Sequence, residues 1–388
     1  MQIAVVGAGI GGLAFAALAA QAGRNVTLVE RFQAPGPVGS GLVIQPVGLA
    51  VLDRIGAGDQ ARVLGAPIAR MLGHAVGRRG AVLDVSYRSG APGLAIHRAA
   101  LFDTLWQAVQ RAAVPVITGA EVIAAPPQGA GRSLILADGR QLGPFDLVVD
   151  AAGAGSHLSP LIARPLRYGA VWANLRWPEG CRLPPDQLRQ RYRGAAQMMG
   201  VLPIGRMQPG GPAMAALFWS LPVADIQAWR DGGVAAWAAQ ARDLWPEAEA
   251  FTAQITDLAQ FTPARYTHGT LRRPHAPGLV QIGDAAHRAS PQLGQGANMA
   301  LLDALALHLA LDQAEPLPAY AAMRRWHIRA YQGMSAAFTP MYQSGSRALP
   351  PLRDHLLAPL SRLPGVRHLL TALVSGDMLP PLAGQRFP

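Results

Sequence analysis

The chain has 388 residues and a formal net charge of +11; half of its residues are hydrophobic and only 15% are charged. This composition excludes an intrinsically disordered protein, and the length suffices for two or three domain-sized units with large cores. All 34 basic residues are arginine and lie scattered without blocks of like charge, which favours a compositional bias over a nucleic-acid partner.

The apolar stretch at residues 1–22 has the hydrophobicity of a secretion signal but not its other features. The first positive charge, Arg24, follows the stretch, four glycines interrupt it, and it continues into the strand-like "NVTLVE". No other segment has about 18 uninterrupted apolar residues, so we expect no membrane span. The single cysteine, Cys181, excludes an internal disulfide and fits a reducing compartment, which favours a cytoplasmic location.

The first thirty residues predict a strand, a glycine turn, a helix and a second strand. Apolar Ile3–Val6 precede the motif GxGxxG, an alanine-rich helix follows as far as Gly23, and the strand Val26–Val29 ends at Glu30. The three glycines allow a tight turn, a close approach of phosphate to the backbone, and packing of the helix on the strand; they are Gly7, Gly9 and Gly12. The helix N-terminus attracts a pyrophosphate and the acid accepts hydrogen bonds from a ribose, so the segment predicts dinucleotide binding.

The α/β pattern continues to about residue 160. It contains a predicted helix that ends at Gly56, hairpin strands within 66–95, and an amphipathic helix entered by His97–Arg98. Further strands follow, with a turn at Asp138–Gly139, and the last of them runs into the glycine-rich stretch "DLVVDAAGAGSHL".

The composition shifts between about 160 and 270. Tryptophan, methionine and short β-like runs predict an inserted, mainly β domain with one helix near 232–243. The α/β pattern resumes at "GLVQIGDAAH", and a helical tail rich in leucine and proline occupies 316–388.

A second signature lies at residues 278–311. A buried strand, Leu279–Ile282, ends at Gly283–Asp284, and a loop containing Pro291 leads to the sequence Gly-Gln-Gly at 294–296. A long helix begins directly after this loop, near Ala297–Asn298.

These motifs together resemble the single-component FAD-dependent aromatic hydroxylases related to p-hydroxybenzoate, salicylate and hydroxynicotinate hydroxylases. The resemblance covers nearly the whole chain and rests on GxGxxG with Glu30, "HRAAL" at 97–101, the glycine turn at 153, and "GDAAH…P…GQGAN". It implies an α/β fold: a Rossmann-like FAD-binding domain with an inserted mainly-β substrate domain and a helical C-terminal tail. The implied ranges are 1–70, 96–160 and 271–345 for the FAD-binding domain, 71–95 and 161–270 for the substrate domain, and 346–388 for the tail.

The resemblance also implies an FAD site. Asp284 would bond the ribityl chain, Arg98 would lie near the phosphates, Val122 beside the adenine and Val43 beside the isoalloxazine ring, while the helix after Gly296 would direct its N-terminus at the flavin pyrimidine. The full implied set is Gly7, Gly9, Ile10, Gly11, Gly12, Glu30, Arg31, Val43, Arg98, Val122, Asp284, Gly294, Gln295, Gly296, Ala297 and Asn298.

The family chemistry has two halves: NADH or NADPH reduces FAD, and a flavin C4a-hydroperoxide formed with O₂ then hydroxylates an electron-rich ring. The implied partners are therefore a small aromatic substrate, O₂ and a transient nicotinamide, because no second dinucleotide motif is present. Apolar residues of the insert could form a dry wall: Trp172, Met198, Met199, Phe218 and Trp219. The substrate-activating base stays open among Tyr168, Arg176, Gln197 and His268.

Alternative functions remain at this point. An FAD-linked reductase or dehydrogenase of the same fold would bind FAD without inserting oxygen, and a non-catalytic FAD sensor is a third class. A flavin halogenase is disfavoured because the chain has no lysine. His287, Pro291 and Asp303 are interpreted as structural residues, and the oligomeric state stays open, with a homodimer among the options.

One position departs from the family pattern. Where these hydroxylases usually have an aspartate before the first glycine of the middle turn, this chain has Ala152. The turn glycines Gly153 and Gly155 and the following Ser156 are kept, but the arginine that often follows is missing, since 157–160 is His-Leu-Ser-Pro. This departure makes it an open question how NADH or NADPH binds to reduce the flavin, whereas FAD binding itself is still expected.

Overall fold

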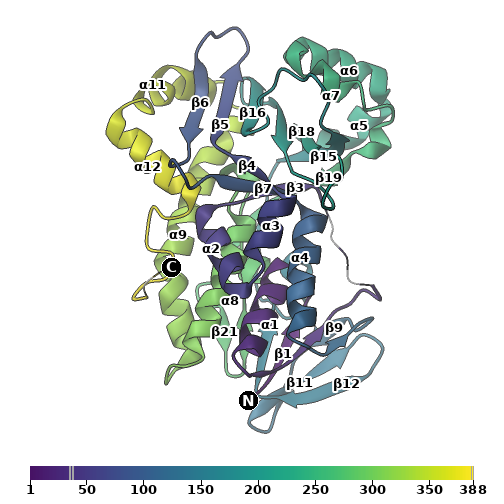
Figure 1. Cartoon of the computed structure of the whole chain (residues 1–388), viewed down its shortest axis with the longest axis vertical. Coiled ribbons are helices and arrows are strands. Elements are labelled where there is room, and N and C mark those ends of the chain that lie inside the picture. The colour runs from purple at the N-terminus through teal and green to yellow at the C-terminus, as the bar shows by residue number, and fades with distance from the viewer. Residues whose placement is uncertain (35, 37–38, 386, 388) are drawn as a thin grey trace.

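A six-stranded sheet forms the lower half of the molecule in Figure 1, a computed structural model that describes residues 1–34, 36, 39–385 and 387. Its strand order is β21-β22-β13-β1-β2-β8, with bounds His275–Ala276, Leu279–Gln281, Leu147–Asp150, Gln2–Val6, Asn25–Val29 and Val116–Ile117. All neighbours are parallel except β21, which is antiparallel to β22. Val6 pairs with both Val29 and Asp150, so β1, β2 and β13 end at the same edge.

Both faces of this sheet are covered, as its continuous apolar strands require. On one face Ile3, Val5 and Leu28 belong to a core shared with six helices: α1 (Ile10–Gln21), α2 (Pro46–Ile55), α3 (Gly58–Leu64), α4 (Arg98–Arg111), α8 (Gly296–Ala310) and α9 (Pro316–Tyr342). On the other face Ala4 and Val6 pack against a small antiparallel sheet of β9 (Val122–Ala124), β10 (Pro127–Gln128), β11 (Gly131–Leu136) and β12 (Gln141–Phe145).

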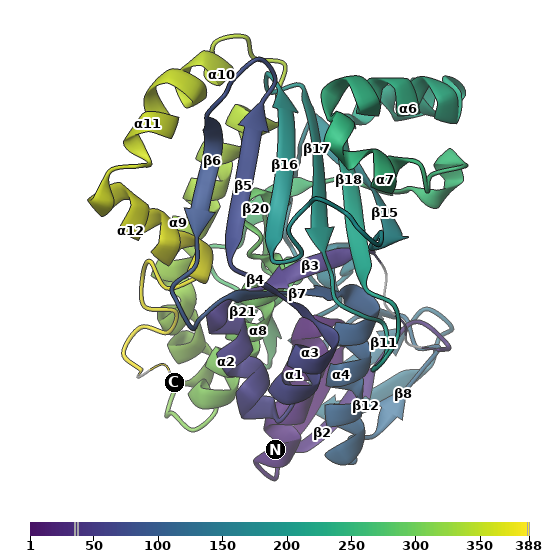
Figure 2. The same ribbon diagram turned by 45° about the horizontal axis from the view of Figure 1, so that its top comes forward.

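A seven-stranded sheet forms the upper half of the molecule and is seen nearly face-on in Figure 2. Its order is β19-β15-β18-β17-β16-β5-β6, with bounds Thr262–Ala264, Tyr168–Arg176, Met214–Pro222, Gln197–Pro203, Gln187–Arg193, Arg70–Ala75 and Ala81–Ser86. One face packs on α5 (Ile226–Asp231), α6 (Gly233–Leu244) and α7 (Glu249–Thr252). The opposite face contributes Met198 and Phe218 to a core that includes Tyr342 at the end of α9 (Pro316–Tyr342).

Two three-stranded sheets connect the halves. In the first, β7 (Gly93–His97) lies between β3 (Gly41–Ile44) and β4 (Ala66–Ile68), and Val43, Ile68 and Ala95 share a core with Leu202 and Ala216 of the upper sheet. The second has the order β14-β20-β23, with bounds Arg164–Pro165, Thr267–Thr270 and His287–Arg288.

The C-terminal region is helical. After α9, the chain forms α10 (Leu349–Leu352), a π-helical turn (Arg353–Leu357), α11 (Ala358–Leu360) and α12 (Pro364–Ser375), and α11 and α12 pack against β6 at the outer edge of the upper sheet (Figure 1). Among the described residues, no helix combines the length and the apolar character that crossing a bilayer requires.

The predicted fold class is confirmed: an α/β Rossmann-like unit, a mainly β second unit and a helical C-terminal region are all present. The single helix predicted near 232–243 is α6, and α5 and α7 lie on either side of it. The predicted hairpin at 66–95 is divided, because β5 and β6 join the upper sheet whereas β4 and β7 pair with β3. The domain boundaries themselves stay a prediction.

Candidate functional site

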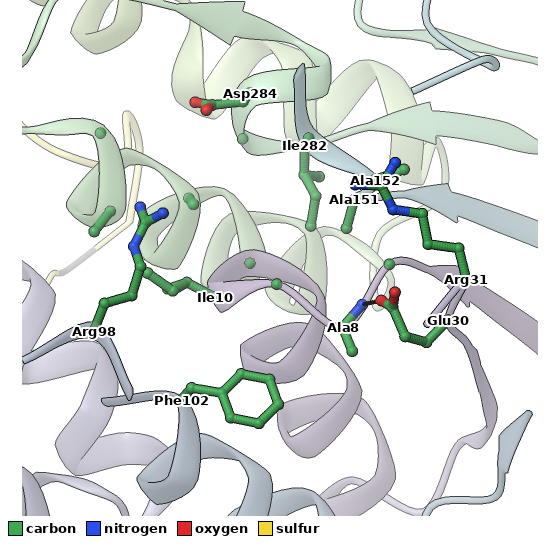
Figure 3. Close-up of a pocket in the computed structure, with 18 of the residues that line it drawn as sticks. Ala8, Ile10, Glu30, Arg31, Arg98, Phe102, Ala151, Ala152, Ile282 and Asp284 are labelled. Atoms are coloured by element: carbon green, nitrogen blue, oxygen red, sulfur yellow. Dashed lines mark hydrogen bonds between the residues drawn. The ribbon is translucent and has the colours of Figure 1, made fainter. Parts of the chain in front are cut away.

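A cavity of about 310 Å³ opens where the parallel strands of the lower sheet end (Figure 3). Its walls come from the loops after β1, β2, β13 and β22 and from the N-terminal parts of α1, α4 and α8. This is the edge at which open parallel sheets bind ligands. The lining residues are Gly7, Ala8, Gly9, Ile10, Gly11, Glu30, Arg31, Phe32, Gly36, Arg98, Phe102, Ala151, Ala152, Gly153, Ile282, Gly283, Asp284, Gly296, Ala297 and Ala300.

The glycines of the first turn have two distinct roles. Gly7 adopts a φ of +102°, and a Cβ there would lie 2.7 Å from the carbonyl oxygen of Ala151. A Cβ on Gly12 would overlap the carbonyl oxygen of Gly7, so both positions need glycine for packing. Gly9 and Gly296 differ, because a Cβ on Gly9 has only the Ala151 carbonyl oxygen near it, at 3.9 Å, and one on Gly296 has no atom within 4 Å. Their backbones are therefore open to a ligand.

Two helices begin at the cavity wall. Gly9 precedes α1 and Gln295 precedes α8, and among the described residues no side chain caps either N-terminus. The first N–H groups of a helix have no partner within the helix and carry the positive end of its dipole. The cavity thus presents two electropositive helix ends, which suit an anion such as a phosphate or a negatively charged ring.

Glu30 is buried at the end of β2 and is held by backbone amides on both sides. One carboxylate oxygen accepts from Ala8 N at 2.7 Å, drawn as a dashed line in Figure 3, and the other accepts from Phe32 N at 3.0 Å. Each carboxylate oxygen can accept a second hydrogen bond, so the pair of oxygens can receive two neighbouring hydroxyl groups.

Arg98 and Asp284 bring opposite charges to the cavity from α4 and from the turn after β22 (Figure 3). Protein surrounds the Asp284 carboxyl although its surface is open to the cavity, and this separation from bulk water raises its pKa against the opposing effects of His287 and Arg98. The same desolvation lowers the pKa of Arg98, with Asp284 opposing the change. A polar ligand between them would meet both a donor and an acceptor.

A buried ion-pair network holds the Asp284 turn from behind. Asp303 in α8 is fully buried and accepts hydrogen bonds from Gly283 N at 2.9 Å, His287 Nε2 at 2.6 Å and Arg324 Nε at 2.8 Å. Burial by itself would raise the pKa of Asp303, but His287 and Arg324 outweigh it and lower the pKa to about 2. The interpretation of His287 and Asp303 as structural residues agrees with these contacts.

Most of the predicted FAD residues come together at this cavity. Ten line it: Gly7, Gly9, Ile10, Gly11, Glu30, Arg31, Arg98, Asp284, Gly296 and Ala297. Gly12 lies beneath the turn, and Val122 lines a smaller cavity of about 50 Å³ that shares Gly7, Glu30 and Arg31 with the main one.

The other four predicted residues lie around the start of α8. Asn298 donates to the carbonyl oxygens of Val43 at 3.1 Å and Gly294 at 3.0 Å, and its Oδ1 accepts from Gln45 N at 2.8 Å. The Gln295 side chain is directed toward α12, where it donates to the carbonyl oxygens of Leu373 and Val374. These contacts fix the loop before α8. Because the Gln295 side chain is engaged with α12, only the backbone atoms of Gly294 and Gln295 are available to a ligand.

The proposed dry wall divides between the two faces of the upper sheet. Trp172, Met198 and Phe218 face the α9 side, and the centroids of the Trp172 and Phe218 rings lie 4.7 Å apart. Met199 and Trp219 belong to the core under α5–α7 on the opposite face, because side chains alternate along a strand. Among the described residues that line the main cavity, none of the four base candidates is present: Tyr168, Arg176, Gln197 and His268.

Several functional residues escaped the sequence reasoning. Phe102 and Ile282 line the cavity, and their apolar character is shared with many core residues, so the sequence carried no separate signal for them. Asp150, at the end of β13, is fully buried and accepts from Ala152 N at 3.2 Å and Ser156 Oγ at 2.7 Å. Burial raises its pKa to about 6, against these hydrogen bonds and Arg288. Its place two residues before Ala152 is a signal that could have been noticed.

Comparison with known proteins adds independent information. The profile of the family described as "FAD binding domain" matches residues 1–141 and 229–320. The 6-methylpretetramide 4-monooxygenase of Streptomyces rimosus is 28% identical over 395 residues, which cover 97% of this chain and 92% of that protein. The 3-amino-4-hydroxybenzoate 2-monooxygenase of Streptomyces cremeus is 30% identical over 349 residues, covering 84% of this chain and 82% of that protein.

Solved structures share the fold. A variant of 2-methyl-3-hydroxypyridine-5-carboxylic acid oxygenase superimposes with a TM-score of 0.78 at 20% identity, covering 96% of both chains. A variant of HpxO from Klebsiella pneumoniae, complexed with FAD, superimposes with a TM-score of 0.79 at 19% identity, covering 98% of this chain and 100% of that chain.

Proposed function

This chain belongs to the FAD binding domain family and is an FAD-dependent monooxygenase, and from that premise we propose that it hydroxylates a small aromatic or heteroaromatic compound. The observation that supports the cofactor is the cavity at the strand ends, with two uncapped helix N-termini, open glycine backbones and a buried glutamate. Each feature corresponds to a chemical part of FAD.

The residues present fit that cofactor. The amides at the start of α1, with Gly9 open beside them, suit the pyrophosphate, and the two oxygens of Glu30 suit the vicinal hydroxyls of the adenosine ribose. Asp284 is placed to accept from ribityl hydroxyls, and the N-terminus of α8 suits negative charge on the flavin pyrimidine. When bound, FAD supplies the two-electron transfer from a nicotinamide and the activation of O₂.

The protein contributes orientation and the exclusion of water. The Asp303 network holds the Gly283–Asp284 turn, and Asn298 holds the loop before α8 against β3. Trp172, Met198 and Phe218 belong to the packed apolar core on the α9 side of the upper sheet, and this core helps to keep water away from the reacting atoms.

Finer features belong to the same proposal. NADH or NADPH reacts as a transient co-substrate, since the sequence holds one dinucleotide motif, the one at residues 7–30. The proposed FAD-binding unit consists of 1–70, 96–160 and 271–345, and the proposed substrate unit of 71–95 and 161–270. We place the enzyme in the cytoplasm, and we propose a homodimer as its oligomeric form.

The test has a binding arm and a reaction arm. The purified protein is expected to hold one non-covalent FAD per chain, and Glu30→Gln is expected to weaken FAD binding roughly tenfold by removing a charge-assisted hydrogen bond. Asp59→Asn, at an exposed ion pair on α3, is the matched control and should leave FAD affinity unchanged. A protein that cannot be reconstituted with FAD would contradict the cofactor assignment.

The reaction arm uses aromatic acids and phenols, screened for substrate-stimulated oxidation of NADH or NADPH. With ¹⁸O₂, the product of an active compound should carry one labelled oxygen atom. Flavin turnover that yields an unlabelled product would support the alternative, an FAD-linked reductase or dehydrogenase of the same fold.

A further inference from the structure

The C-terminal segment from α10 to α12 exposes leucines along one face. Leu352, Leu356, Leu360 and Leu363 are between 40% and 52% exposed; a spacing of four residues places the first three in one row, and Leu363 follows where the chain turns into α12. Leu369, at the first turns of α12, is exposed in the same way. A surface helix ordinarily directs its polar residues outward and its apolar residues toward the core, so this row is the reverse of the usual pattern.

The buried side of the same segment explains why the leucines stay outside. Arg353 is only 1% exposed; it pairs with Asp354 at 2.7 Å and donates to the carbonyl oxygens of Gly194 and Met341 at 3.2 and 2.9 Å. Its guanidinium also lies over the ring of Tyr342, 5.0 Å from the centroid. Rotating the segment to bury the leucines would expose this network, so the packing of the fold keeps the row exposed.

Positive charge surrounds the leucine row. Arg362 and Arg367 lie within the segment, and Arg78 and Arg79 lie in the turn between β5 and β6, whose contact with the segment is a 3.0 Å approach of Arg78 Nη1 to His355 Nε2. The acids of this region have partners: Asp354 pairs with Arg353, Asp84 with Arg70, and Asp377 with Arg88, while Arg367 and Arg362 also help to lower the pKa of Asp84. The segment lies along β6 at the outer edge of the molecule (Figures 1 and 2), and the turn between β5 and β6 adds its two arginines beside the leucines.

We propose that this leucine–arginine face (Leu352, Leu356, Leu360, Leu363 and Leu369 with Arg78, Arg79, Arg362 and Arg367) binds the surface of an anionic phospholipid bilayer. Leucines can enter the boundary between headgroups and acyl chains while arginines contact lipid phosphates. A second copy of the chain fits less well, because an isologous contact uses the same surface on both subunits and would bring two cationic faces together. The attachment is peripheral, consistent with the finding that no described helix spans a bilayer.

Vesicle sedimentation tests the proposal with the FAD-loaded full chain. Binding is expected to vesicles of phosphatidylcholine with about 30% phosphatidylglycerol, to be much weaker on phosphatidylcholine alone, and to fall as salt rises. Arg362→Gln with Arg367→Gln should lower the partition coefficient roughly tenfold or more, and Leu356→Ser with Leu360→Ser should lower it on anionic vesicles without changing its salt dependence.

Matched controls remove the same kinds of side chain elsewhere. Ile162→Ser removes another exposed apolar residue, and Arg230→Gln removes an exposed arginine on α5, and neither should affect vesicle binding. Flavin absorbance and the thermal midpoint verify that each variant is folded. Equal binding of the wild type to neutral and anionic vesicles, or unchanged binding of both double variants, would overturn the proposal. So would a concentration-dependent dimer that the leucine variant abolishes while vesicle binding is absent.

Discussion

Replacing Asp303 with asparagine tests whether one buried carboxylate holds the edge of the FAD cavity. Asp303 accepts from Gly283 N, His287 Nε2 and Arg324 Nε, and both Asp303 and Arg324 are at most 1% exposed. Asparagine keeps the shape of the side chain but removes its charge, which leaves the Arg324 guanidinium buried without a counter-ion. The Gly283 amide also loses its charged acceptor, and Gly283 directly precedes Asp284 at the cavity.

The magnitude follows from this burial. Breaking a buried ion pair by removing one partner costs about 3–5 kcal/mol. With an unfolding entropy of about 2.1 cal/mol/K per residue, 388 residues give roughly 0.8 kcal/mol per degree, so Tm should fall by about 4–6 °C. The pKa of Asp303 is lowered from 3.8 to about 2, so its ionisation contributes roughly 2 kcal/mol above pH 4, and this contribution is lost as the pH falls through 2.

The assay is thermal and urea unfolding of both proteins between pH 3 and pH 8, with FAD retention followed by gel filtration. The difference between wild type and variant should be constant from pH 5 to pH 8 and should shrink below pH 4. Asp312→Asn is the control, since the Arg24–Asp312 pair is 72% exposed on the aspartate side and contributes less than about 1 kcal/mol. A variant of Asp303 that matches this control at pH 7 and retains FAD would refute the reasoning.

Three further outcomes are expected. Burial raises the folded-state pKa of Asp150 from 3.8 to about 6, so its ionisation destabilises the apoprotein fully above pH 6 and not below pH 4; urea unfolding should find Asp150→Asn more stable at pH 8, by up to about 3 kcal/mol, and unchanged at pH 4. Gly12→Ala should prevent folding, measured as loss of soluble protein, whereas Gly9→Ala should fold normally and bind FAD more weakly in a fluorescence titration. Anaerobic stopped-flow reduction should be slow and weakly selective with NADH and NADPH while FAD stays bound, and fast, saturable reduction by one of them, unchanged in Ala152→Asp, would show that nucleotide recognition lies elsewhere.

The parts of the site that could be predicted are those whose geometry is local. The turn at 7–12, the acid at the end of β2 and the segment at 279–298 each place a strand, a loop and a helix N-terminus in one continuous stretch. Parallel pairing of the strands then brings these loops to one edge of the sheet, independently of how the upper sheet is built. Nine of the ten predicted residues that line the cavity lie in or directly beside these stretches, and the tenth, Arg98, comes from the start of α4.

The parts that could not be predicted depend on contacts between distant segments. Arg324 reaches Asp303 only because α9 packs on α8, and the Gln295 side chain turns to α12 because the last turn of that helix brings two carbonyl oxygens within reach. β5 joins the upper sheet by pairing in parallel with β16, more than a hundred residues away. The C-terminal leucines stay exposed because Arg353 and Ala358 occupy the buried side of their segment, and the sequence does not indicate which side is buried.

Asp150 supports the turn in which Ala152 replaces the usual aspartate. This chain has no carboxylate at position 152, where these hydroxylases usually have one, but it has Asp150 two residues earlier, at the buried end of β13, where it accepts from Ala152 N and Ser156 Oγ. The turn is therefore held from beneath, and the cavity receives the methyl group of Ala152 in place of a charge. A methyl group neither repels a pyrophosphate nor accepts a hydrogen bond from a nicotinamide nucleotide, so the exchange preserves the conditions for FAD binding while it removes a contact that the second nucleotide could use. Moving the carboxylate back, with Asp150→Gly and Ala152→Asp together, should therefore change reduction by NADH or NADPH more than it changes FAD affinity.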